Sequence, residues 1–396
     1  MNLKELAKKH EDYSIEMRRH FHMYPEPSME EYETQKKVME ELDKMNIENF
    51  KAAGTGVVGI IKGEKDGKVV ALRADMDALE LLEESDVPYK SKNEGYMHGC
   101  GHDGHTAGLL TAGKILNELK SDIEGTVKLI FQPGEENGKG ALALINEGIL
   151  DDVDAIFGIH LWNELESGKV SVEAGPRMAS AGIFEIHVKG QGGHGSMPDQ
   201  GVDAGLVGAA ILMNLQSVVS RELSPLTPAV LSIGIFQSGT RFNIIPSKAY
   251  LEGTTRCFSM EINEKLEYQI KRIVENTANA YNAEAELTYS VLSMPTINDE
   301  KLSEYASKVA VELLGEEGNV IFEKTTGGED FSFFSTKAKT EFVFVGTRND
   351  EKVKYYPHHH SHFDIDESAL STAAGLYAGF AIEYLKGENS DVSPNL

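Results

Sequence analysis

Cysteine, long apolar runs and positive charge are all scarce in this chain. Its 396 residues include only two cysteines, Cys100 and Cys257, so the disulfide framework of a small secreted protein is excluded. No apolar run approaches the ~20 residues that a membrane-spanning helix needs. The first residues lack the apolar core of a secretory signal, which predicts a cytoplasmic location.

Basic residues are outnumbered, with 38 Lys and Arg against 63 Asp and Glu and a formal net charge of -25. A field of this sign repels phosphate backbones and anionic lipid, so nucleic acids and membrane surfaces are not expected as partners. The 41% hydrophobic content and the mean hydropathy of -0.30 fit a globular protein with a substantial core.

Two kinds of patterning divide the chain. Before residue 182 and after residue 295, short apolar runs alternate with longer amphipathic ones, which predicts a doubly wound, mostly parallel α/β sheet with helices on both faces. Strands are expected at 57–61, 69–74, 127–132, 155–160 and 342–346. Helices are expected at 3–21, 29–45, 106–119, 139–147, 300–314 and 369–386.

Residues 182–295 follow a different order of strand, helix, two strands, helix and strand. The expected strands are 183–189, 229–236, 247–256 and 285–291, and the expected helices are 204–221 and 263–281. This β-α-β-β-α-β order predicts a ferredoxin-like α+β domain. We therefore predict a catalytic domain formed by 1–181 and 296–396, interrupted by an inserted domain of 182–295.

Side chains that bind metals concentrate in four segments of the predicted catalytic domain. The segments are HGCGHDGH at 98–105, QPGEE at 132–136, IH at 159–160 and HHHSH at 358–362. The second and third lie at the carboxyl ends of predicted strands, which is the edge where open α/β sheets bind ligands. We therefore expect these distant segments to meet at one edge of the sheet.

The residue types indicate a chemistry for this edge. Cys100 and His102 are two residues apart, so in an extended stretch they would face the same side. A thiolate with imidazoles favours zinc, manganese, nickel or cobalt over calcium or magnesium. Glu135 and Glu136 diverge on a turn, so one can bind metal while the other handles a proton.

Each of these features has a common structural explanation. A lone histidine such as His160 is more often a core residue, and an adjacent glutamate pair is more often a solvated turn. Several such groups at strand ends together favour a metal hydrolase. Asp75 and Asp77 follow the strand at 69–74 and are expected either to orient a ligand histidine or to cap a helix.

The same residues carry a resemblance to the M20 metallopeptidase family, in its amidohydrolase branch. That branch includes aminoacylase-like, hippurate and indole-acetyl-amino-acid hydrolases. The resemblance extends over nearly the whole chain, and its most specific runs are those containing Cys100 and Glu135. The matching runs are RRHFH at 18–22 with PE at 25–26, LRADMDAL at 72–79, MHGCGHDGH at 97–105, FQPGEE at 131–136, GIH at 158–160, GQGGHG at 190–195, FNIIP at 242–246, GTTR at 253–256 and GGEDF at 327–331.

The resemblance implies a site for two divalent metal ions with Glu135 as the general base. The implied ligands are Cys100, His102, Glu136, His160 and a C-terminal histidine. Alignment of Phe363 and Asp364 with the family pattern places that histidine at His359. Ser361 stands where the family has proline, and His358 and His360 are the alternatives.

For the inserted domain, the resemblance implies a lid that also forms a dimerisation surface. His194 would polarise the scissile carbonyl, often across a dimer, and otherwise reads as a surface-loop residue. Asn243 and Arg256 would bind the polar end of the substrate. For Arg256 the alternative is a salt bridge within this domain. A homodimer or higher homo-oligomer is therefore expected.

The expected activity is metal-dependent hydrolysis of the amide bond of N-acyl amino acids, which gives a carboxylic acid and a free amino acid. The partner is thus a small-molecule substrate. Alternatives are a dipeptidase or exopeptidase, an N-acetyl-diaminopimelate deacetylase and a non-catalytic metal-binding scaffold. Glu135 beside Glu136 argues against the scaffold, which has no need of a spare carboxylate.

Overall fold

The computed structural model describes residues 2–390, which form two compact units. Residues 2–175, 297–323 and 330–390 make the first unit. The second comprises Pro176–Thr296 and a return segment, Lys324–Glu329. The domain boundaries drawn from the sequence at 182 and 295 stay predictions. They do not include the return segment, Lys324–Glu329.

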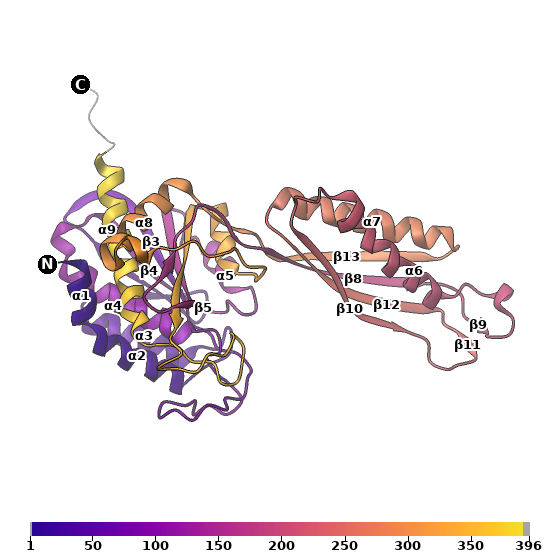
Figure 1. Cartoon of the computed structure of the whole chain (residues 1–396), viewed down its shortest axis with the longest axis horizontal. Helices are drawn as coiled ribbons and strands as arrows, with labels where there is room; N and C mark the ends of the chain where they lie inside the picture. The colour runs from indigo at the N-terminus through magenta and orange to yellow at the C-terminus, as the bar shows by residue number, and fades with distance from the viewer. Residues whose placement is uncertain (1, 391–396) are drawn as a thin grey trace, which may run out of the picture. The chain divides into compact units, whose positions relative to one another are not determined.

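A seven-stranded sheet forms the centre of the first unit, in the order β1-β2-β4-β3-β5-β15-β6. The four neighbours β4, β3, β5 and β15 are parallel, whereas β1, β2 and β6 add antiparallel pairs at the two edges. The predicted mostly parallel α/β fold is therefore confirmed (Figure 1). The strands are β1 Glu48–Ala52, β2 Gly56–Lys62, β3 Lys65–Asp75, β4 Glu124–Gln132, β5 Ala155–Glu166, β15 Lys339–Arg348 and β6 Val170–Ser171.

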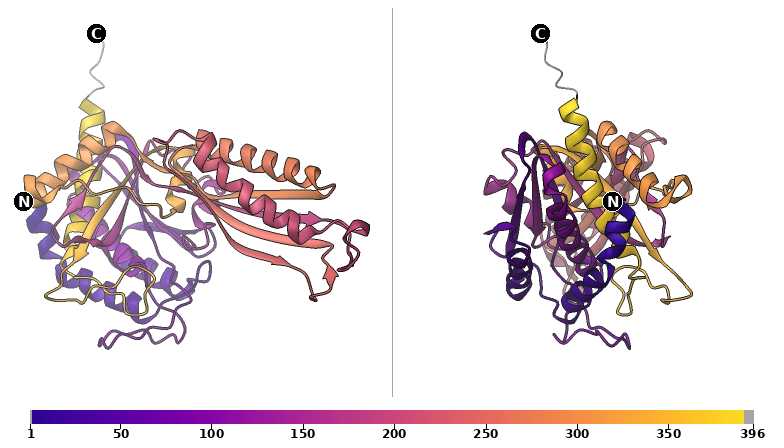
Figure 2. Two further views of the ribbon diagram at one scale, coloured as in Figure 1. Left: turned by 45° about the vertical axis from the view of Figure 1, so that its right-hand side comes forward. Right: turned by 90° about the vertical axis from the view of Figure 1, so that its left-hand side faces the viewer.

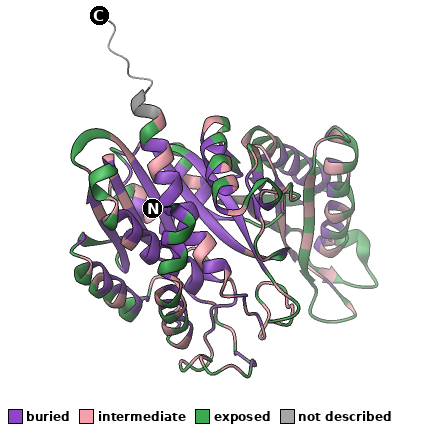
Figure 3. Cartoon of the chain, turned by 60° about the vertical axis from the view of Figure 1, so that its left-hand side comes forward, coloured by how far each residue is buried: buried purple, intermediate pink, exposed green. Residues whose placement is uncertain are grey.

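Consecutive residues of β5 show how the two faces of this sheet are covered. Phe157 stacks on Phe380 of α9 at 4.3 Å between ring centroids. A Cβ on the next residue, Gly158, would instead meet Phe331 and Phe342 within 3 Å. Adjacent strand residues point to opposite faces, so α9 covers one face and the segment around Phe331 the other. Figure 2 shows α9 in yellow against the sheet, and Figure 3 shows the buried strands among helices with exposed outer faces.

The helices of the first unit follow the predicted pattern with shifted ends. The predicted helix at 3–21 is two helices, because the chain leaves helical geometry at His10 (φ -103°, ψ 11°), whose ring lies 2.9 Å from Glu118 of another helix. The helices are α1 Leu3–Lys9, α2 Glu11–Met23, α3 Tyr32–Lys44, α4 His102–Glu118, α5 Gly140–Asn146, α8 Glu300–Leu314 and α9 Ala369–Ser390.

A four-stranded antiparallel sheet forms the second unit, in the order β10-β12-β8-β13. Two helices pack on it, and the chain order is the predicted β-α-β-β-α-β. A short pair, β9 with β11, lies beyond one end of this sheet (Figure 1). The elements are β8 Ser180–Lys189, β9 Gly193–His194, α6 Ala204–Ser217, β10 Ala229–Ser238, β11 Ile244–Ile245, β12 Lys248–Cys257, α7 Met260–Ala280 and β13 Glu284–Ser293.

Helix α6 continues into a π-helical turn, Val218–Glu222. Among the described residues, Ala204–Glu222 is the one helix whose length and composition would allow it to cross a membrane. Core helices pass the same test, and Val207, Ile211 and Leu215 of α6 are buried in the core of the second unit. The feature is therefore weak evidence for a membrane span.

Candidate metal centre

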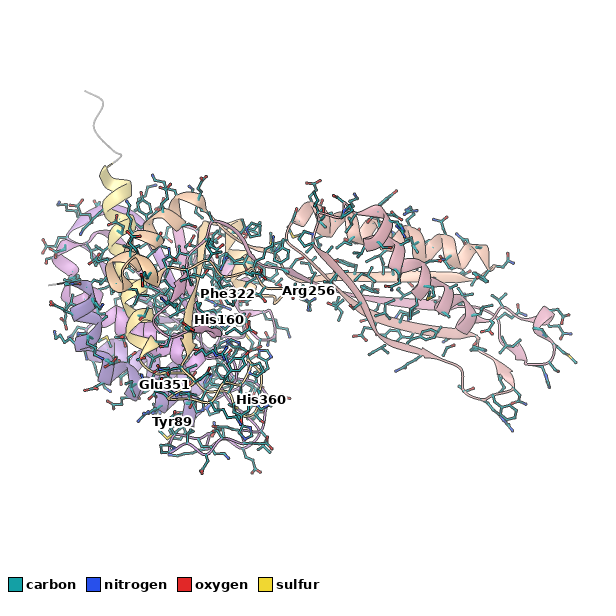
Figure 4. The ribbon with its side chains drawn as sticks, viewed as in Figure 1. Tyr89, His160, Arg256, Phe322, Glu351 and His360 are labelled. Carbon is teal, nitrogen blue, oxygen red and sulfur yellow. The ribbon has the colours of Figure 1, made fainter. Side chains whose placement is uncertain are left out.

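The first unit brings five predicted ligand residues to one place. Cys100, His102 and His160 have donor atoms within 4.8 Å of one another. Cys100 forms a second such group with Glu136 and His359, and Glu135 and Glu136 form a third with His102. The groups share members, so one compact cluster results. Figure 4 labels His160 in this part of the first unit.

The local backbone geometry around Cys100 and His102 differs from the extended stretch that the sequence suggested. They do not lie in an extended stretch, because His102 is the first residue of α4. Gly101 between them has a φ of 89° in the left-handed region, where glycine carries no steric penalty. A turn followed by a helix start therefore directs both side chains, in place of strand alternation.

Histidine hydrogen bonds fix which nitrogen faces the cluster. His102 donates from Nδ1 to the main-chain oxygen of Asp77 at 2.9 Å, and His160 donates from Nδ1 to the oxygen of Leu161 at 2.9 Å. The Nε2 atom of His102 is buried and has no hydrogen-bond partner among the described residues. The Nε2 atom of His160 lies 3.5 Å from the sulfur of Cys100. Such second-sphere bonds orient metal-binding imidazoles, so both rings fit a metal site.

His105 lies against the same cluster but has no nitrogen left for a metal. Its Nε2 accepts the main-chain N–H of Leu161 at 2.8 Å, and its Nδ1 donates to Asp75 at 2.5 Å. The accepted N–H determines the tautomer, in which Nδ1 carries the ring hydrogen that faces the Asp75 carboxylate. Asp75 therefore orients His105, whereas Asp77 contacts His102 as the sequence suggested.

Among the clustered histidines near the C-terminus, His359 is the one that joins Cys100 and Glu136. Its Nε2 lies 3.7 Å from Glu136 Oε1, and its main-chain N–H donates to Gly99 at 2.8 Å. His359 has a φ of 62°, an uncommon conformation for a residue with a side chain. Strain of this kind concentrates at functional sites, which supports His359 as the ligand.

The neighbouring histidines make other contacts. His358 is buried and donates from Nε2 to the oxygen of Leu161 at 3.0 Å. Burial lowers the pKa of His358 to about 4, so the ring is neutral at pH 7. His360 stacks on Tyr356 at 4.5 Å between centroids, and its Nδ1 accepts the N–H of His362.

The cluster has the electrostatics of a cation site. Burial raises the pKa of the Cys100 thiol well above its usual value, and the nearby Glu136 carboxylate raises it further. Burial also holds the pKa of His160 well below its usual range, so this imidazole stays neutral. A bound dication would offset the charge of a thiolate here. The mixture of sulfur, nitrogen and oxygen donors suits zinc, manganese, nickel or cobalt.

One charged residue behind the cluster was given no role by the sequence reasoning. Asp330 is buried and accepts hydrogen bonds from Arg73 at 3.0 Å and from Gln132 at 2.7 Å. Its own N–H lies 3.4 Å from Glu135 Oε1. The only sequence signal was its place in the GGEDF run, where it follows Glu329.

The other predicted site residues lie in the second unit. His194 is exposed on β9, and its Nδ1 accepts from the hydroxyl of Ser196 at 2.8 Å. Asn243 contacts the same loop through its main-chain oxygen, which accepts the N–H of Gly195. The Oδ1 atom of Asn243 is buried and lacks a partner among the described residues.

Arg256 lies near the other end of β12, as Figure 4 shows for this unit. It donates to the oxygen of Thr255 at 2.9 Å and to the hydroxyl of Thr254. Burial lowers the pKa of its guanidinium. Within residues 2–390 it has no carboxylate partner, so the intradomain salt bridge considered for it is absent. Its remaining donors suit a ligand carboxylate.

Comparison with known proteins assigns the family. Residues 71–383 match the model described as peptidase family M20/M25/M40. The chain belongs to this family. An N-acetylcysteine deacetylase from Bacillus subtilis is 40% identical over 94% of this chain and 97% of its own length. The thermostable carboxypeptidase 2 of Saccharolobus solfataricus is 40% identical over 96% of this chain and 98% of its own.

A solved structure supports the same assignment. The Bacillus subtilis YXEP protein, described as a dinuclear metal-binding peptidase of the M20 family, is 36% identical with a TM-score of 0.85. The match covers 96% of this chain and 99% of that one. The M20 resemblance inferred from the motifs is confirmed, and with it an enzyme of the amide-hydrolysing kind.

Proposed function

We propose that the chain hydrolyses the amide bond of N-acyl amino acids and uses two divalent metal ions held by Cys100, His102, Glu136, His160 and His359. The observation that carries the proposal is the cluster itself, in which these donors form overlapping groups beside a further carboxylate, Glu135. The deacetylase relative supports the substrate class, since N-acetylcysteine is an N-acyl amino acid.

Each of these residues has a separate role in the proposed hydrolysis. Divalent cations at such a site polarise an amide carbonyl and acidify water. Glu135 removes a proton from the attacking water and later delivers it to the leaving nitrogen. His194 donates a hydrogen bond to the developing oxyanion. Arg256 pairs with the carboxylate of the amino acid, which a planar guanidinium can bind through two oxygens.

The separation of the second-unit residues favours a dimer. The loop with His194 and Asn243 lies beyond the Lys248 end of β12, whereas Arg256 lies near its other end. Eight residues of strand span roughly 26 Å, so one small substrate cannot touch both groups in a single chain. We propose that one subunit supplies Arg256 and another supplies His194 to each site.

A carboxypeptidase is the second candidate, favoured by the Saccharolobus relative. Both activities release an amino acid with a free carboxylate, so the same Arg256 contact would serve either. They differ in the acyl side, which is a simple acid in one case and a peptide in the other.

The cytoplasmic location remains an expectation from the sequence.

The test is a substrate panel of N-acetyl, N-benzoyl and indole-acetyl amino acids beside unblocked dipeptides and N-blocked peptides. Each is assayed with zinc, manganese, nickel or cobalt. We expect the N-acyl amino acids to be cleaved fastest, and faster cleavage of peptides would favour the second candidate. Glu135→Gln should keep its metal but lose at least ~10² in kcat. Wild-type turnover in that variant would remove Glu135 from the mechanism.

A further inference from the structure

The loop that carries Glu135 and Glu136 is hydrogen-bonded to the buried carboxylate of Glu31, which has no role in the proposed mechanism. Glu31 Oε1 accepts the main-chain N–H of Gly134 at 2.8 Å. The same oxygen accepts the N–H of Met29 at 2.9 Å, and Oε2 accepts the hydroxyl of Thr55. Glu31 is fully buried, so its hydrogen bonds are shielded from water.

Backbone strain marks the same contact. Met29 has a φ of 67°, which is uncommon for a residue with a side chain. Gly134 has a φ of 61°, and a Cβ there would lie 2.5 Å from the sulfur of Met29. The Met29 side chain thus packs directly on Gly134, and surrounding contacts must maintain the uncommon backbone conformation of Met29.

A second hydrogen-bonded path joins the same segment to the loop. Ser28 donates its hydroxyl to Asp77 Oδ2 at 2.6 Å, and this oxygen also accepts the N–H of Glu136 at 3.0 Å. Residues 28–31 therefore contact Gly134 directly and Glu136 through Asp77. The loop between these contacts contains Glu135.

We propose that Glu31 is a positioning residue that holds the loop at 133–136, so that Glu135 meets the substrate while Glu136 faces the metal ions. The proposal rests on the proposed function in assigning the proton to Glu135. Without the acceptor at Gly134 the loop relaxes. A displacement of about 1 Å at a reacting group costs on the order of 10² in rate.

A nearby carboxylate provides a matched control for simple damage to α3. Glu26 accepts the N–H groups of Glu33 and Thr34 at 3.1 and 2.8 Å at the start of α3. Its carboxylate makes these contacts and one to the Thr34 hydroxyl, and none to the loop at 133–136. Glu26→Ala therefore weakens α3 without releasing Gly134.

The experiment uses the full-length, metal-loaded protein with Glu31→Leu, Glu31→Gln, Glu31→Asp and Glu26→Ala. It measures kcat and KM for the best N-acyl amino acid, and hydrogen exchange of the peptide covering 133–136. Glu31→Leu should lower kcat by ~10–100-fold with KM changed by less than about threefold, and should speed exchange. Glu31→Gln keeps an oxygen acceptor, so its kcat and its hydrogen exchange at 133–136 should stay within about threefold of wild type. Glu26→Ala should leave both unchanged.

Glu31→Asp keeps the charge but falls short of Gly134, so it should show the same defects in milder form and serves if the leucine variant does not fold. Wild-type exchange and kcat in Glu31→Leu or Glu31→Asp would overturn the proposal, as would an equal defect in Glu26→Ala. If the wild type cleaves none of the panel, the proposed function fails, and the exchange measurement alone then decides whether Glu31 holds the loop.

Discussion

His102 donates its Nδ1 hydrogen to the main-chain oxygen of Asp77, and Asp77 Oδ1 lies 3.3 Å from the same nitrogen. The Asp77 side chain also accepts the N–H of Glu136 through Oδ2. One residue thus orients two of the proposed ligands. Burial would raise the pKa of Asp77, but the contacts with His102, Ser28 and the N–H of Glu136 together lower it below its usual value, so Asp77 stays ionised.

Asp77→Ala should therefore weaken metal binding while all proposed ligands remain in the sequence. We expect a loss of ~10–100-fold in affinity, the usual effect of removing a second-sphere partner. Competition with a chromophoric chelator measures it. Asp86→Ala, at an exposed loop position, is the control and should bind metal like the wild type. Equal affinity in both variants would show that the main-chain oxygen alone orients His102.

His194 lies beyond one end of β12 and Arg256 near the other end, and this separation predicts complementation between two inactive variants. Each of His194→Ala and Arg256→Ala alone should lose most activity. After the two are mixed under conditions that exchange subunits, each mixed dimer has one intact site. About a quarter of wild-type activity should return if pairing is random in a symmetric dimer. No recovery despite confirmed exchange would place both groups on the same subunit at each site.

The burial of His98 predicts a pH dependence of stability. Neither of its ring nitrogens has a hydrogen-bond partner among the described residues, and burial lowers its pKa to about 4. In the unfolded chain a histidine takes up a proton near pH ~6.5. Between these values the unfolded state binds more protons. The free energy of unfolding of the metal-free protein should therefore fall as pH drops, by at most ~1.4 kcal/mol per pH unit for this group.

Urea unfolding at pH 7, 6 and 5 measures this slope. His98→Gln should have a slope that is shallower by up to one proton, whereas His187→Gln, at an exposed position on β8, should keep the wild-type slope. The comparison uses slopes, so a uniform loss of stability in either variant does not affect it. Identical slopes for His98→Gln and the wild type would mean that His98 takes up its proton in the folded protein as it does in the unfolded chain.

Gly140, at the start of α5, packs against the loop at 133–136, so a side chain there should lower both stability and kcat. A Cβ there would lie 1.6 Å from the main-chain oxygen of Pro133, so the backbone between them must shift. Gly140→Ala should cost about 1–3 kcal/mol or more in unfolding free energy and reduce kcat. Gly234→Ala is the control, because a Cβ there meets nothing within 4 Å. Thermal unfolding and steady-state kinetics distinguish the two.

Much of the fold was predictable because the buried strands are continuous apolar runs. The run at 155–160 gave the start of β5, but the strand continues to Glu166. Beyond Leu161, exposed and buried residues alternate along β5, and this part of the strand pairs with β15 alone. Its hydrophobic pattern is therefore weaker than the continuous apolar run of the part that is buried on both faces. The missed strand β1 is an edge strand with mostly exposed residues.

The site was predictable as a set of residue types and not as a geometry. Cys100 and His102 were grouped on the geometry of an extended stretch, whereas the structure has a left-handed turn at Gly101 and a helix that begins at His102. The main-chain oxygens of Asp77 and Leu161 orient histidines, and main-chain atoms leave no signal in a sequence. Sequence reasoning assigned no role to Glu31 within the predicted helix at 29–45, because the contact that marks it is made with a loop far along the chain.

One oxygen described above has a consequence for synthesis. The carbonyl of Leu161 accepts hydrogen bonds from the ring of its neighbour His160 and from His358, which follows 197 residues later. The whole second unit is translated between these two contacts. On the ribosome, a nascent chain that has emerged only through that unit would lack His359, so full metal capture would be among the last events of its maturation.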